Sequence, residues 1–107
     1  PIVSIGPMLA LEDLRTALVT TRSPVVAVSP LVGGQVLKGP TAVFMQWAGQ
    51  PLRNDGIAAL YAGVIDGLVG DEHTDAVPVL ECDVLLDSPD ARRRVAERTL
   101  RFALSLG

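Results

Sequence analysis

The chain has 107 residues, of which 49% are apolar and 20% charged, and its net charge is −3. This length and composition predict one small folded domain or part of a larger one, and they exclude a disordered chain. The acidic balance gives no surface for nucleic acid, and no apolar run reaches the roughly 18 residues that span a membrane. The single cysteine excludes an internal disulfide and fits a reducing compartment, so we expect a cytoplasmic protein.

The first part of the chain predicts a strand, a helix and a second strand. A short strand in residues 1–9 ends in a Gly-Pro turn, and a helix follows over 11–21. Leu11, Leu14 and Leu18 have the three- and four-residue spacing of one buried helix face. The run "SPVVAVS" at 23–29 is apolar without alternation and rich in β-branched residues. Such a run is typical of a strand that is buried on both faces.

The middle of the chain predicts two helices. One covers 41–50, with Thr41 as its cap and Gly49 at its end. The other begins at Asp55, where Asn54 or Asp55 is expected to be a cap. We expect Trp47 and Tyr61 to be packing residues on these helices, although either could border a flat ring.

The last part predicts two strands and a closing helix. The strands lie in "DGLVGDE" and "VPVLECDVLL", where Cys82 is expected to be a small buried residue. Ser88 and Pro89 fit the cap and first residue of the helix. Strands that alternate with helices predict an α/β, Rossmann-like fold with a mostly parallel sheet and flanking helices. The high apolar content suggests that residues 1–107 are part of a larger three-layer domain.

The stretch "SPLVGGQVLKGP" at 29–40 is the strongest candidate for a binding site. Gly33 and Gly34 can adopt positive φ and let backbone N–H groups approach an anion closely. Lys38 adds a positive charge, and Gly39 leads into the start of a helix, which also favours an anion. The order of residues is neither a Walker P-loop nor GxGxxG. From the residues alone, a phosphate-binding loop and a plain turn with a solvated lysine both remain open.

Two further segments carry polar residues. Ser4 and Gly6 follow the first strand and could line the same crevice, although an ordinary turn explains them as well. The acidic run "DEHTD" at 71–75 contains the only histidine, His73, and residues that can bind a divalent metal. A solvated loop is the preferred interpretation of that run, and no nucleophile motif accompanies the histidine.

The motif "SPLVGGQVLKGP" resembles the SPxVGG…KGP segment of the 2-phospho-L-lactate transferase family, which acts in the biosynthesis of the deazaflavin coenzyme F-420. The segments "PIVSIGPMLALEDLRTAL" before this motif and "LYAGVIDGLVGDE" and "VPVLECDVLLDSPDARRRVAERTLRFAL" after it resemble further segments of the same family, in the same order. The resemblance implies that residues 1–107 are the C-terminal portion of a single α/β domain, and we expect an N-terminal half before Pro1. One departure is that "DEHTDAVPVLECD" leaves no room for a helix that the family usually has there.

The resemblance also implies a reaction. A guanosine diphosphate ester of phospholactate, or of its phosphoenolpyruvate or glyceryl analogue, would donate the phosphoryl-linked acid to the ribityl hydroxyl of the deazaflavin Fo, with release of GMP. The family would supply Mg²⁺ and its ligands from the N-terminal half, and it suggests a homodimer. No general base is assigned, and this chain alone is expected to be inactive.

The residues that the resemblance assigns to substrate binding lie in two segments of the chain: Ser4, Gly6, Ser29, Pro30, Gly33, Gly34, Lys38 and Gly39. Lys38 is the expected stabiliser of charge. Two alternatives stay open, namely a nucleotide-binding relative without catalysis and an inactive fragment of the same fold.

Overall fold

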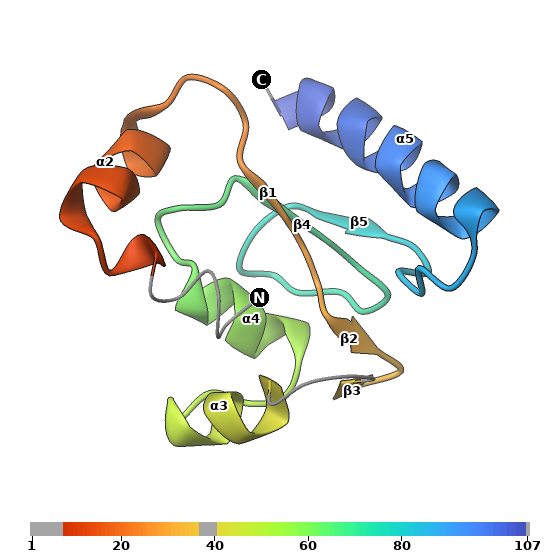
Figure 1. The fold of residues 1–107 in the computed structure, drawn as a ribbon, viewed down its shortest axis with the longest axis horizontal. Helices are drawn as coiled ribbons and strands as arrows, with labels where there is room; N and C mark the ends of the chain where they lie inside the picture. Colours follow the sequence, from red (N-terminus) through yellow and green to blue (C-terminus); the bar gives the residue numbers. More distant parts are fainter. Residues whose placement is uncertain (1–7, 37–40, 107) are drawn as a thin grey trace.

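The structure is a computed structural model that describes residues 8–36 and 41–106 (Figure 1). The expected first strand therefore lies largely outside the described residues. The elements in chain order are α2 (Glu12–Thr20), β1 (Val26–Val28), β2 (Leu31–Val32), β3 (Gln35–Val36), α3 (Thr41–Trp47), α4 (Asn54–Leu60), β4 (Gly67–Gly70), β5 (Val79–Glu81) and α5 (Pro89–Leu106).

Three parallel strands form the central sheet in the order β1-β4-β5. Val26 pairs with Gly67 across the first ladder, and Leu68 pairs with Val79 across the second. All four residues of β4 are buried, as expected for the middle strand. The predicted α/β, Rossmann-like class with a parallel sheet is confirmed.

Helices cover both faces of this sheet (Figure 1), and a separate apolar core lies on each. The core on the side of α2 and α4 contains Leu31, Met45, Ile57 and other buried residues. The core on the side of α5 is built on Val69, Val84 and Val95, with Phe102 packed against it. Cys82 is half-buried against this second core.

The closing helix begins as the sequence predicts. The Ser88 hydroxyl accepts a hydrogen bond of 3.0 Å from the N–H of Ala91, and Pro89 is the first helical residue. Within this helix, Ala91 and Val95 are buried. The cap satisfies an N–H group that has no partner inside the helix, so this local signal is sufficient to place the helix start.

Three predictions about burial are wrong. Leu11 is 63% exposed and no residue of α2 is buried, because α2 packs on the core through the half-buried Leu18. Trp47 is 83% exposed on the short helix α3 and is not a core residue. The strand β1 is half-buried and not buried on both faces, because it is the end strand of the described sheet.

Candidate functional site

The candidate site lies at the carboxyl edge of the parallel sheet. Ser29 directly follows β1, and Asp71 and Glu72 follow β4. Asn54 opens α4 beside them. Parallel strands bring their carboxyl ends to the same edge, which is where open α/β sheets bind ligands.

A buried polar network joins these elements. The Ser29 hydroxyl donates to Asn54 Oδ1 at 2.6 Å, and Asn54 Nδ2 donates to the Glu72 carbonyl at 2.7 Å. Ser29 is 4% exposed and Asn54 is 1% exposed. The Ser29 oxygen also accepts the N–H of Leu31 at 3.2 Å. Because buried polar groups are costly without partners, this network fixes the end of β1 against α4 and the loop after β4.

Gly70 leaves the space that the network occupies. A Cβ atom at this position would lie 2.5 Å from Asn54 Nδ2 and 3.3 Å from the Ser29 Cβ. Glycine is therefore required here for close approach of the strand to the amide. Farther along the same loop, the buried Thr74 donates its hydroxyl to the Asp55 carboxylate, which ties the loop to α4 again.

The glycine-rich stretch forms a hairpin. Its strands β2 and β3 are antiparallel, and Gly33 and Gly34 form the turn with φ values of 60° and 76°. The expected positive φ is confirmed. A Cβ at either glycine would meet nothing within 4 Å, so the backbone conformation and not packing requires glycine.

An aspartate directly after β4 holds this turn in place. The Gly33 N–H donates to Asp71 Oδ2 at 2.8 Å, across 38 residues of sequence. A carboxylate thus lies where the anion-nest prediction places a phosphate oxygen. The contact links the hairpin to the end of β4, and it occupies one of the N–H groups that the predicted loop would offer to a ligand.

The structure brings half of the predicted site residues to one edge. Ser29 is buried, and Pro30 and the two glycines of the turn follow it. The other four predicted residues, Ser4, Gly6, Lys38 and Gly39, lie outside the described residues. Sequence reasoning treated Asn54 as a cap, and it missed that this side chain bridges two segments of the sheet edge. A polar residue before an apolar helix was the only signal, and it does not reveal a partner 25 residues away.

In the acidic run after β4, Asp71, His73 and Asp75 are exposed, whereas Thr74 is buried. His73 Nε2 lies 2.8 Å from Asp75 Oδ1, and the hydrogen bond to this carboxylate raises the pKa of the imidazole. Across residues 8–36 and 41–106, no group of three or more histidine, cysteine or acidic side chains is placed to hold a metal ion.

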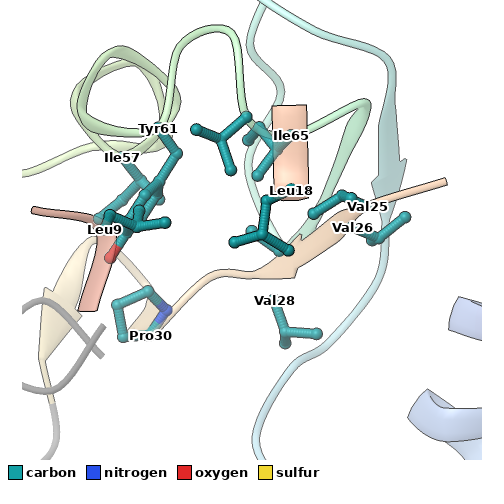
Figure 2. A pocket seen from close by; sticks show the side chains of 11 residues that line it. Leu9, Leu18, Val25, Val26, Val28, Pro30, Ile57, Tyr61 and Ile65 are labelled. Atoms are coloured by element: carbon teal, nitrogen blue, oxygen red, sulfur yellow. The ribbon is translucent and has the colours of Figure 1, made fainter. Parts of the chain in front are cut away.

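An apolar pocket of about 400 Å³ lies on the face of the sheet that carries α2 and α4. Figure 2 shows Tyr61 beside Ile57 and Leu9, with Pro30 at the same end of the pocket. Tyr61 is 8% exposed, and within the described part of the chain its hydroxyl has no hydrogen-bond partner. Burial raises the pKa of this phenol. The pocket thus has apolar walls and one buried hydroxyl.

The fold defines an α/β protein of the Rossmann-like type, a class in which ligands bind at the carboxyl ends of the strands. The side chains at the edge hold loops in place. In the described segments, none of the helices is long and apolar enough to cross a membrane.

No family model matches the chain. It is nevertheless 39% identical over 109 residues to a 2-phospho-L-lactate transferase of Haloarcula marismortui, which covers 98% of this chain and 32% of the relative. A 2-phospho-L-lactate transferase of Halobacterium salinarum is 41% identical over 107 residues, with 97% and 31% covered. One of Methanocaldococcus jannaschii is 32% identical over 112 residues, with 99% and 35% covered.

Over nearly its whole length the chain is therefore similar to 2-phospho-L-lactate transferases, of which it matches the C-terminal part. It spans about a third of the length of the curated relatives it matches.

Proposed function

We propose that this chain contributes one wall of the active site of a transferase of coenzyme F-420 biosynthesis. The observation that carries the proposal is the identity of 32–41% to curated 2-phospho-L-lactate transferases, which extends over nearly the whole chain. The proposed reaction transfers a phospholactyl or phosphoenolpyruvyl group from a guanosine diphosphate ester to the ribityl hydroxyl of the deazaflavin Fo. The hydroxyl oxygen attacks the phosphorus that bears the three-carbon acid, the bond to the GMP oxygen breaks, and the hydroxyl proton is lost.

Such a reaction depends mainly on positioning and on neutralising charge at phosphorus. In the proposal, the donor's phosphates lie at the carboxyl edge of the sheet against the β2–β3 hairpin. Lys38 and Gly39, which follow the hairpin in sequence, supply the positive charge and the close backbone approach. Asp71 holds the hairpin through the Gly33 N–H, so its role is to position the turn and not to react. Ser4 and Gly6 are proposed to complete the same wall.

The remaining parts of the proposal concern groups outside this chain. Mg²⁺ would neutralise phosphate charge, and its ligands are proposed to come from the part of the transferase that this chain does not span. The active form is proposed to be a cytoplasmic homodimer. Neither the metal nor the dimer enters the roles given to the residues above.

One observation favours a second candidate. The Asp71 carboxylate occupies the Gly33 N–H, and an anionic ligand would be repelled by it at that position. This contact supports the alternative that the hairpin is a structural turn in a nucleotide-binding relative without catalysis, or in an inactive fragment.

A chimera tests the proposal. This chain replaces the matching segment of the Haloarcula marismortui relative, and the chimera is assayed for transfer to Fo and for binding of GDP by calorimetry. We expect Lys38→Ala and Gly34→Val each to weaken GDP binding at least about tenfold, which is about 1.4 kcal/mol. Arg22→Ala is the matched control, because it removes one cation just before β1, at the opposite edge of the sheet. The proposal would be refuted if Lys38→Ala and Gly34→Val left GDP binding unchanged, or if the chimera bound no GDP.

A further inference from the structure

The tip of the β2–β3 hairpin carries two backbone N–H groups that the hairpin itself does not use. Val32 pairs with Gln35, so the turn consists of the two glycines between them. Both glycines have positive φ, and the hydrogen bond that closes a turn of this type joins the flanking residues. In the described part of the chain, the Gly33 N–H is bonded to Asp71 and the Gly34 N–H has no partner. Neighbouring N–H groups in a turn form a concave surface that suits an anion.

Asp71 is held on this turn by one exposed contact. Its Oδ2 accepts the Gly33 N–H at 2.8 Å, and within the described residues the side chain makes no other hydrogen bond. The backbone on either side is fixed, because Gly70 belongs to β4 and the Glu72 carbonyl accepts a side-chain amide from α4. The carboxylate can therefore leave the turn by rotation of the Asp71 side chain, without movement of the sheet.

The surroundings of the turn admit a ligand but set two anions against each other. A Cβ atom built at Gly33 or Gly34 would meet nothing within 4 Å, so no packed side chain covers the glycines from that side. A phosphate oxygen that accepts the Gly33 N–H would lie next to the Asp71 carboxylate. Like charges a few ångströms apart repel each other even at a protein surface, and salt only partly screens them. The carboxylate and an anionic ligand therefore exclude each other from this N–H.

We infer that Asp71 is an internal competitor for the anion site of the hairpin, an autoinhibitory contact that holds the Gly33 N–H until an anion displaces it. An anion binds at the turn only when the carboxylate has rotated away. Its apparent affinity is therefore lowered by the fraction of molecules in which the N–H is free. The contact makes the hairpin selective for anions that bind strongly enough to displace Asp71. The inference rests on the proposed function for the identity of the natural anion, but the competition itself concerns the turn alone.

Removal of one charge tests the competition. Asp71→Asn keeps an oxygen that can accept the Gly33 N–H but removes the negative charge beside it. Inorganic pyrophosphate is titrated into this chain at low ionic strength, and NMR follows the amide resonances of Gly33 and Gly34. We expect Asp71→Asn to bind pyrophosphate at the turn at least about fivefold more tightly than the wild type does. Asp87→Asn is the matched control, because Asp87 is also an exposed aspartate and is not bonded to the hairpin.

The inference would be overturned if Asp71→Asn and Asp87→Asn changed the affinity for pyrophosphate equally, because net charge alone would then explain the change. It would also be overturned if the two glycine amides did not respond to pyrophosphate in any of the proteins. Weaker binding by Asp71→Asn than by the wild type would contradict it as well, since the carboxylate would then support the conformation that binds.

GDP binding by the Haloarcula marismortui chimera separates this inference from the proposed function. If Asp71→Asn gains affinity for pyrophosphate but the chimera binds no GDP, the proposed function is refuted and the competition stands. If the chimera binds GDP with the same affinity with and without Asp71→Asn, the proposed function stands and the competition is refuted.

Discussion

The hydrogen bond between Ser29 and Asn54 is expected to couple the contributions of these two residues to the free energy of unfolding. Asn54→Ala removes the acceptor of the Ser29 hydroxyl, which is 4% exposed, and the donor to the Glu72 carbonyl. Each buried polar group left without a partner costs about 1–3 kcal/mol. Because the half-buried Glu72 region can be rehydrated in part, we expect a loss of about 2–4 kcal/mol for Asn54→Ala and about 1–3 kcal/mol for Ser29→Ala.

A double-mutant cycle measured by urea denaturation separates the pair from its surroundings. Once either partner is gone, the second substitution no longer breaks the 2.6 Å hydrogen bond, so the double variant should lose about 1–2 kcal/mol less than the sum of the single losses. Ser105→Ala is the control, since this exposed hydroxyl bonds only to its own helix, and it should change stability by less than about 0.5 kcal/mol. A coupling below about 0.5 kcal/mol would show that the network does not act as a unit and would refute the reasoning.

Three further outcomes follow from the same structure. Gly70→Ala should lower the free energy of unfolding by about 1–3 kcal/mol, because its Cβ would lie 2.5 Å from the Asn54 amide. An unchanged free energy of unfolding, measured by urea denaturation, would contradict this contact. Tyr61→Phe should leave stability at neutral pH unchanged or slightly higher, because the buried hydroxyl has no partner in the described residues. Because burial raises the pKa of Tyr61, the unfolded chain loses the phenol proton at a lower pH than the folded chain does. The free energy of unfolding of the wild type should therefore fall as the pH rises from about 10 through the folded pKa. The urea midpoint of Tyr61→Phe should not show this decrease. Asp75→Asn should lower the pKa of His73 toward its usual value, as followed by NMR of the ring protons, and an unchanged titration would show that the hydrogen bond is not formed in solution.

The features that the sequence predicted correctly are those that local chemistry decides. Ser88 and Pro89 mark the start of α5 because a cap needs only residues three positions apart. The parallel sheet follows from strands that alternate with helices. The positive φ of Gly33 and Gly34 follows from the absence of a Cβ.

The features that the sequence did not predict depend on distant partners. The strands β2 and β3 have two residues each, too few for a periodic signal. Asn54 and Asp71 acquire their roles through hydrogen bonds to residues 25 and 38 positions away. The burial of β1 was predicted wrongly for a related reason, since an apolar run does not reveal that its strand lies at the end of the described sheet.

The proposed site begins where the strand β1 ends. Its carboxyl end continues directly into Ser29 and the hairpin, and among the described strands β1 pairs with β4 alone. In the chimera, a strand that docks on the other side of β1 would restrict the motion of β1 and, through Ser29, the position of the hairpin against Asp71. Preorganisation of a loop strengthens binding because less entropy is lost when the ligand arrives. We therefore expect the isolated chain to bind GDP more weakly than the chimera does, even though both contain the same glycine-rich segment. Equal affinity in the two proteins would show that the hairpin is already fixed by Asp71 and the Ser29–Asn54 pair, and that docking at β1 has no effect on the site.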